Sequence, residues 1–282
     1  MKNPRTIQIA IIAGIVLLVG FLFSQDIKGL VKPKEDKAAM PAEQPQTNSL
    51  NITEVSATAK NLISNAAANE FNVLEKAYQK ASGEDKVNQA KVLAKKWDDL
   101  EQPVPSALYL EEAANGQPTL VNWLNAGDRF LKAFDSTQDS LIKADVLHKA
   151  NGAFGKAIAI DSANLDAKTG MGITIVNGLG APMQGIAMLL DVVKQDPKNF
   201  KANMNLGLFA IKSGQFDKAV TRFEDIINKI KATPDAYFYL ATAYESLGKK
   251  EKAVNAYLQS KKLAANPTLS NFIDKKVAEL KK

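Results

Sequence analysis

Few side chains in this 282-residue sequence could perform chemistry. It contains no Cys, which excludes disulfides, thiol nucleophiles, thiolate metal sites and lipid-modified cysteine anchors. It contains one His, which excludes His-rich metal sites and paired-His chemistry within one chain. That residue, His148, has no carboxylate or Ser at a spacing on its predicted helix that would indicate a catalytic pair. A surface or partly buried helix position is therefore favoured over a general base.

Acidic residues give no catalytic pattern either. Asp98-Asp99 and Glu111-Glu112 are pairs of neighbours in the sequence, and neighbours on a helix point about 100° apart. Such pairs are more typical of solvated helix faces than of a general acid and base that act together. We therefore predict that the chain is not an enzyme.

The stretch of residues 178–185 is Gly-rich and suggests phosphate or dinucleotide binding at first sight. It lacks the Lys-Ser/Thr of a phosphate loop, and its third Gly is misplaced for a dinucleotide fingerprint. A position between two helices explains it better: Gly180 would cap one helix, Pro182 would start the next, and Gly185 would pack. The sequence thus predicts no cofactor, no metal and no small-molecule substrate.

The charge balance is mildly basic. Lys and Arg total 36 against 30 for Asp and Glu, a net charge of +6. Residues 1–51 hold six basic and four acidic side chains, so the excess is spread between this segment and the mixed-charge remainder. A nucleic-acid-binding domain needs a concentrated basic patch, so we expect no nucleic-acid partner.

The amino terminus has the layout of a membrane-targeting segment. Residues 1–6 form a short basic leader, and residues 7–23 are apolar except for Gln8. Spanning helices need ~17–25 residues and signal-peptide cores ~7–15, so the length alone does not decide. The apolar stretch ends without the small-x-small pattern of a cleavage site, which favours an uncleaved transmembrane signal-anchor helix over 7–23. A cleaved signal is the alternative.

The sequence indicates less directly on which side of the membrane the folded domain lies. Basic residues lie before the apolar stretch and also after it, so a count of positive charges does not decide the orientation. A short basic leader before an apolar core is the usual layout of exported proteins, and the composition fits a bacterial source. We therefore favour a single-pass protein of the bacterial inner membrane with its soluble domain in the periplasm. A cytoplasm-facing domain is the alternative.

A flexible linker is predicted after the anchor, over residues 24–51. Pro33, Pro41 and Pro45 interrupt any helix, and few large apolar residues are available to bury. Such a segment cannot offset the entropy cost of ordering, so it would act as a tether for a folded domain.

The rest of the chain, from residue 52, is predicted to be helical and repetitive. Apolar residues recur three and four positions apart, and no alternating β-branched run is long enough for a sheet. The strongest signal is a 34-residue period. It relates columns of small or apolar residues, namely Gly180, Gly214 and Gly248; Gly185, Ala219 and Ala253; Ile186, Val220 and Val254; and Leu189, Phe223 and Tyr257.

Each column has a physical reason. A small residue at Gly172, Gly207 or Ala241 lets two antiparallel helices approach closely, and the second column provides the small residue of the partner helix. The aromatic residue or Leu four positions later fills the space between units. The Gly of the first column would end a helix in a left-handed cap, and Pro marks the break before the next helix.

These columns resemble the tetratricopeptide repeat family, whose unit is a 34-residue helix-turn-helix. Two stretches carry the motif in full, Leu206-Gly207…Gly214…Phe216…Ala219…Phe223 and Leu240-Ala241…Gly248…Ala253…Tyr257. The resemblance implies an all-α fold, an α-solenoid of such repeats, preceded by the single transmembrane helix and the linker. Repeats occupy residues 161–267, a degenerate repeat-like region occupies 52–160 with one leading helix or cap over 50–81, and a capping helix occupies 268–282.

The family resemblance also implies a binding surface. The first helix of each pair lines the concave side of the solenoid, where an extended peptide or an amphipathic helix of a partner protein would bind. Aligning the repeats predicts these groove residues: Ile173, Asn177, Lys201, Met204, Asn205, Leu208, Lys212, Phe238, Thr242 and Glu245. The apolar members would form a strip, unless some of them pack against neighbouring helices instead.

The predicted function is a membrane-anchored scaffold for protein–protein interaction in the bacterial cell envelope. Its partners would be proteins, together with the membrane through residues 7–23. The layout is similar to that of the tetratricopeptide-like ancillary subunits of the bacterial Sec translocon, which implies help in protein export or in assembly of envelope complexes. The alternatives are a cytoplasm-facing recruiter of a soluble complex and a non-catalytic subunit of an envelope enzyme complex.

Overall fold

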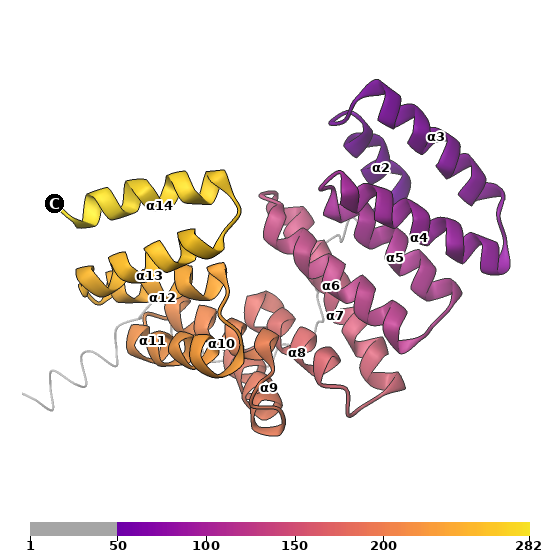
Figure 1. The fold of residues 1–282 in the computed structure, drawn as a ribbon. Helices are drawn as coiled ribbons and strands as arrows, with labels where there is room; N and C mark the ends of the chain where they lie inside the picture. The colour runs from indigo at the N-terminus through magenta and orange to yellow at the C-terminus, as the bar shows by residue number, and fades with distance from the viewer. Residues whose placement is uncertain (1–49) are drawn as a thin grey trace, which may run out of the picture. The chain divides into compact units, whose positions relative to one another are not determined.

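A computed structural model describes residues 50–282, which fall in the larger of two compact units of the chain, Thr47–Lys282. All regular structure in the described part is helical (Figure 1), which confirms the predicted all-α fold. The predicted leader, the predicted span at 7–23 and nearly all of the predicted linker lie outside the described residues. Within residues 50–282, no helix combines the length and the apolar character needed to cross a membrane.

Thirteen α-helices and two short π-helical segments make up the described chain. In chain order they are α2 (Ile52–Lys60), α3 (Asn65–Lys80), α4 (Gly83–Asp99), α5 (Pro103–Gly116), α6 (Leu120–Ser136), α7 (Ser140–Ile160), α8 (Leu165–Thr174), η1 (Ile175–Leu179), α9 (Pro182–Gln195), α10 (Phe200–Lys212), α11 (Phe216–Asp225), η2 (Ile226–Ile230), α12 (Pro234–Ser246), α13 (Lys250–Leu263) and α14 (Pro267–Leu280).

Local sequence explains where many of these helices begin. A polar side chain at the N-cap accepts hydrogen bonds from backbone N–H groups that have no partner within the helix, as Asn164 does for α8 and Asn199 for α10. Pro occupies the first turn of α9, α12 and α14, where its missing N–H costs nothing. Asn51, which we predicted to end the linker, is the N-cap of α2.

The start of the described chain differs from the predicted single leading helix. Residues 50–81 form two helices, α2 and α3, because Ser64 starts a new helix by accepting a hydrogen bond from the N–H of Ala67. Farther along, α4 pairs with α5, and the long α6 is followed by a short loop before α7.

The helices pack as successive hairpins. Extensive contacts join α4 with α5, α6 with α7, α8 with α9, α10 with α11 and α12 with α13, and the second helix of each hairpin also packs on the first helix of the next. Contacts also link first helices of neighbouring hairpins, α6 with α8, α8 with α10 and α10 with α12. This is the arrangement of an α-solenoid, in which each unit buries its apolar face against the next.

Small residues allow the hairpins to close. A Cβ atom added at Gly185 would lie 2.5 Å from the carbonyl oxygen of Gly172, so the backbones of α8 and α9 are in direct contact. At Gly207 the added atom would lie 2.6 Å from the ring of Phe223, so this glycine makes room for the aromatic side chain of α11. The contact of Gly172 with Gly185 follows the predicted columns, whereas Phe223, predicted to fill the space between units, packs against Gly207 within its own hairpin.

One predicted cap is wrong. Gly214 and Gly248 have φ of 72° and 70°, the expected left-handed conformation, but Gly180 has φ of 170° and is extended. The positive φ in this repeat, 144°, belongs to Gly178 inside η1. The reason lies in the length of the unit: eight positions separate Gly172 from Gly180, against seven from Gly207 to Gly214. The extra residue widens the last turn of the helix into a π-helical one.

Candidate functional site

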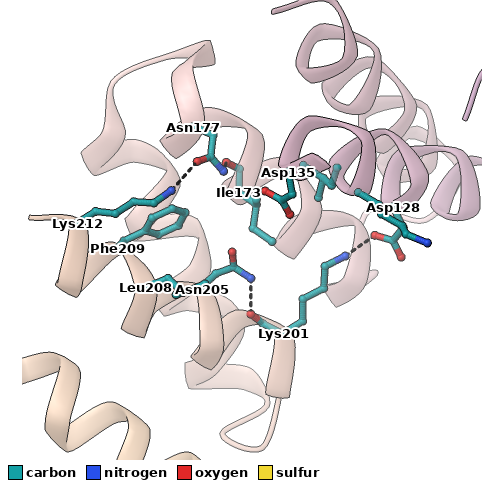
Figure 2. Close-up of a pocket in the computed structure, with 11 residues that line it drawn as sticks. Asp128, Asp135, Ile173, Asn177, Lys201, Asn205, Leu208, Phe209 and Lys212 are labelled. Carbon is teal, nitrogen blue, oxygen red and sulfur yellow. Dashed lines mark hydrogen bonds and ion pairs between the residues drawn. The ribbon is translucent and has the colours of Figure 1, made fainter. Parts of the chain in front are cut away.

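A cavity of about 310 Å³ opens between α6, α8 with η1, and α10 (Figure 2). Spacings of three and four residues place its lining side chains on one face of each helix. Six of the ten predicted groove residues lie together in it, namely Ile173, Asn177, Lys201, Asn205, Leu208 and Lys212. The remaining lining residues are Asp128, Leu131, Lys132 and Asp135 of α6, and Phe209 of α10.

The floor of this cavity is apolar. Leu131, Ile173 and Phe209 are buried, and each comes from a different helix. Leu208 is half-buried beside them. An apolar side chain of a partner that entered here would be removed from water at little cost to the protein, because these residues are already ordered by the core.

The rim of the cavity is polar and carries both charges. Lys201 forms an ion pair with Asp128 across α10 and α6, and the Nζ of Lys212 donates to Oδ1 of Asn177 at 3.3 Å. Asn205 donates its Nδ2 to the carbonyl oxygen of Lys201 at 2.8 Å, which holds its amide in place. Side-chain amides held this way can hydrogen-bond to the backbone of an extended peptide.

Asp135 lies at the same rim. Partial burial by the surrounding protein raises the pKa of its carboxyl group, and the charges of Lys212 and Lys143 oppose this shift. Among residues 50–282, neither Ser nor His lines this cavity beside the carboxylate.

Met204 does not belong to the cavity. It is 9 % exposed and belongs to the same core cluster as Ala219, Phe223 and Tyr244. Met204 precedes Leu208 by four residues and shares nearly the same face of α10, but neighbouring helices cover its side chain. For this residue the alternative of core packing holds.

Phe238, Thr242 and Glu245 lie on a different surface of the solenoid, where α12 meets α13 and α14. The ring of Phe238 contacts that of Phe272 in α14, with centroids 5.9 Å apart. Glu245 accepts hydrogen bonds from the hydroxyl of Tyr257 at 2.8 Å and from Nζ of Lys276 at 3.0 Å. Phe238 and Glu245 therefore contact α14, whereas the hydroxyl of Thr242 lies 3.4 Å from that of Tyr257 in α13.

The buried phenol of Tyr257 supports that role. Burial raises the pKa of Tyr257 to about 12, and the hydrogen bond to Glu245 acts in the same direction. The hydroxyl therefore stays protonated at neutral pH and remains a donor to Glu245.

A second, larger cavity was not predicted from the sequence. It has a volume of about 550 Å³ and lies between α4, α5 and α6. Its residues come from the degenerate region, where the repeat columns are too weak to assign facing positions. The available signal was the pairing of basic residues at helical spacing, namely Lys91 with Lys95 on α4 and Arg129 with Lys132 on α6.

The adjacent carboxylates of the sequence also acquire roles in packing. Asp98, which we expected on a solvated face, forms ion pairs with Arg129 and Lys132 of α6. Burial by itself raises the pKa of Asp98, but the hydrogen bond from Lys132 and the two positive charges outweigh it, and the pKa lies below its usual value. Glu111 pairs with Lys149 at 2.7 Å. These contacts join neighbouring helices and form no acid/base dyad.

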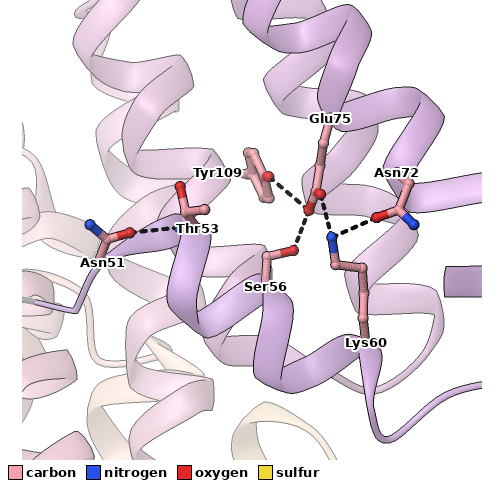
Figure 3. A network of polar contacts seen from close by, with 7 residues as sticks. All are labelled: Asn51, Thr53, Ser56, Lys60, Asn72, Glu75 and Tyr109. Atoms are coloured by element: carbon pink, nitrogen blue, oxygen red, sulfur yellow. Dashed lines mark hydrogen bonds and ion pairs between the residues drawn. The ribbon is translucent and has the colours of Figure 1, made fainter. Parts of the chain in front are cut away.

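A cluster of polar side chains joins α2, the first described helix, to its neighbours (Figure 3). The carboxylate of Glu75 in α3 accepts hydrogen bonds from Ser56, from Nζ of Lys60 at 2.6 Å and from the hydroxyl of Tyr109 at 3.3 Å. Burial raises the pKa of Tyr109, and the nearby charge of Glu75 adds to the shift. The cluster joins α2, α3 and α5, and its polar groups are engaged in hydrogen bonds with one another.

The comparisons with known proteins agree with this architecture. A family model, described as tetratricopeptide repeat, matches residues 234–267. A search of curated proteins found no significant match to the sequence. Within residues 50–282, no group of three or more acidic or His side chains is arranged to hold a metal ion.

Two solved structures show the same fold. One is a thermophilic tetratricopeptide repeat protein of Thermus thermophilus, 15% identical, with a TM-score of 0.53 over 69% of this chain and 98% of that one. The other is PilW, a type IV pilus biogenesis factor, 19% identical, with a TM-score of 0.52 over 69% of this chain and 85% of that one. The described chain is thus an α-solenoid with the tetratricopeptide repeat fold, and residues 234–267 form one such repeat.

Proposed function

We propose that this chain is a membrane-anchored scaffold that binds a segment of a partner protein in the cavity between α6, α8 and α10. The observation that carries the proposal is the chemistry of this cavity: an apolar floor from three helices lies between amide and charged side chains. That combination suits an apolar side chain presented by a peptide or by an amphipathic helix.

The size of the cavity supports a peptide side chain over a larger ligand. Its volume of about 310 Å³ is at the lower end of the ~300–1,000 Å³ typical of small-molecule pockets. One apolar side chain would fill the floor, while Asn177, Asn205 and Lys212 would hydrogen-bond to the backbone on either side of it. The role is binding, without catalysis or a cofactor.

The anchor and its orientation complete the proposal. Residues 7–23 would span the bacterial inner membrane, and the solenoid would work in the periplasm, in protein export or in assembly of envelope complexes. The support is the sequence pattern of a basic leader, an apolar stretch and a polar, Pro-containing segment. A cytoplasm-facing recruiter and a non-catalytic subunit of an envelope enzyme complex are the competing proposals.

Protease accessibility decides between the two orientations. In cells with a permeabilised outer membrane, we expect added protease to digest the solenoid while a cytoplasmic marker protein stays intact. A solenoid that resists protease until the inner membrane is broken would overturn the periplasmic assignment and favour the cytoplasm-facing one.

A substitution at Leu208 tests the cavity itself. We expect Leu208→Glu to weaken partner binding at least about tenfold, since a carboxylate cannot be buried against the apolar floor without a partner. Stability should change by about 1 kcal/mol or less, because Leu208 is half-buried. The readout is photo-crosslinking in membranes from a probe at Lys212, combined with thermal unfolding.

The matched control is Leu258→Glu. Leu258 is 41 % exposed and lies on α13, away from the cavity, so this change adds the same charge without touching the floor. If both variants lose the crosslinked product equally, or neither does, the cavity is not the binding site.

A further inference from the structure

The second cavity, between α4, α5 and α6, is rich in positive charge. Lys91 and Lys95 contribute from α4, and Arg129 and Lys132 contribute from α6. Two carboxylates, of Asp98 and Asp128, also line it. The net charge of the lining side chains is therefore positive.

Both carboxylates already have partners. Asp98 is paired with Arg129 and Lys132, and the distance from its Oδ1 to Nζ of Lys132 is 2.8 Å. Asp128 is paired with Lys201, which reaches it from the first cavity. Within the described part of the chain, each acidic group of the cavity is therefore neutralised by cations other than those of α4.

The two lysines of α4 are left without an acidic partner. Among residues 50–282, neither Lys91 nor Lys95 forms an ion pair; Lys91 only donates a long hydrogen bond to Gln117, at 3.4 Å. They are four residues apart, so their side chains point the same way from one helix face. Two like charges held side by side repel each other, and an anion between them relieves this.

An unused hydroxyl lies in the same cavity. Ser106 of α5 is 1 % exposed, and its Oγ has no hydrogen-bond partner among the described residues. A buried hydroxyl without a partner is costly, and an acceptor that entered the cavity would satisfy it. The site therefore offers a donor as well as positive charge.

The two cavities are neighbours on one surface. Asp128 and Lys132 of α6 line both of them, so a single segment of a partner can pass from the apolar floor to the basic cavity. The positive charge of the second cavity would then favour acidic residues next to the apolar residue of that segment.

We propose that the cavity between α4, α5 and α6 binds the side-chain carboxylates of an acidic segment of the partner protein, next to the apolar residue held between α6, α8 and α10. The proposal rests on the proposed function, and it names the chemistry of the partner. Lys91 and Lys95 supply the charge that the carboxylates meet, and Asn125 supplies an amide at the rim.

A pair of short peptides tests this site separately from the apolar floor. The probes are a fluorescent peptide of six glutamates with an amidated C-terminus and its six-glutamine counterpart, so any carboxylate that binds belongs to a side chain. Fluorescence anisotropy is measured with the full chain in a non-ionic detergent at low salt. We expect the glutamate peptide to bind, the glutamine peptide not to bind, and added salt to weaken the complex.

Charge-removing variants locate the contact. We expect Lys91→Gln with Lys95→Gln to weaken binding of the glutamate peptide about fivefold or more. Lys250→Gln with Lys262→Gln removes the same charge from α13 and should leave binding unchanged. Equal weakening by both pairs would mean diffuse attraction to a basic protein, and no weakening by the first pair would equally overturn the proposal.

The Leu208→Glu variant keeps the two proposals apart. Because the glutamate peptide has no apolar residue, its binding should survive this substitution. If Leu208→Glu abolishes partner crosslinking but leaves peptide binding intact, both sites are supported. If Leu208→Glu leaves partner crosslinking intact while Lys91→Gln with Lys95→Gln abolishes peptide binding, the apolar site is overturned and the acidic one stands.

Discussion

Replacement of Phe154 by Ala is expected to lower the free energy of unfolding by about 3–5 kcal/mol. The ring of Phe154 is fully buried and lies between two glycines, Gly127 of α6 and Gly170 of α8. A Cβ atom added at Gly127 would come within 2.7 Å of this ring, and one at Gly170 would be closer still. The ring therefore fills a space bounded by backbone, which cannot collapse around the smaller side chain.

Urea unfolding followed by circular dichroism measures this effect in the full chain. The control is Phe272→Ala: this ring is 45 % exposed on α14, and its loss should cost about 1 kcal/mol or less. A Phe154 variant as stable as the Phe272 variant would show that the joint between α6, α7 and α8 is looser than these contacts imply.

The second large effect is expected at Gly185. Replacement by Leu places a Cβ atom 2.5 Å from the carbonyl oxygen of Gly172 and 2.9 Å from the backbone N of Val176. Overpacking usually costs about 1–3 kcal/mol, and this case should reach or exceed the upper value because the obstructing atoms are backbone and cannot rotate away. Helices α8 and α9 would have to separate, which would also disturb the cavity floor at Ile173.

A glycine in open surroundings provides the matched control. Gly152 lies inside α7, and an added Cβ atom would meet nothing within 4 Å. Gly152→Ala should therefore stabilise the protein by up to about 1 kcal/mol, through the higher helix propensity of Ala. Thermal unfolding of Gly185→Leu and Gly152→Ala should give midpoints shifted in opposite directions. Shifts of the same sign would contradict the close approach of α8 and α9.

The 34-residue period was sufficient to predict the repeat architecture. Gly207 and Phe223, or Gly172 and Gly185, meet within one hairpin, so their spacing is set by helix and turn lengths that the sequence displays directly. Gly127 has the same role toward Phe154, yet it was not predicted, because the long α6 and α7 move the pair out of the common spacing.

The lining of the first cavity was predicted in part for a related reason. Lys201, Asn205, Leu208 and Lys212 follow one face of α10, and helical periodicity alone places them together. Periodicity could not show that Met204, four residues before Leu208 on nearly the same face, would be covered by neighbouring helices. Nor could it show that α14 would pack over Phe238 and Glu245.

The sequence by itself determined the helices, their pairing and the small residues that let them pair, since these depend on contacts between residues close along the chain. Tertiary structure alone decided which faces remain open. The basic cavity needs Lys91 of α4 and Arg129 of α6 on the same surface, and this depends on how one hairpin is rotated against the next. That rotation arises from side-chain packing between units, which no spacing within one repeat encodes.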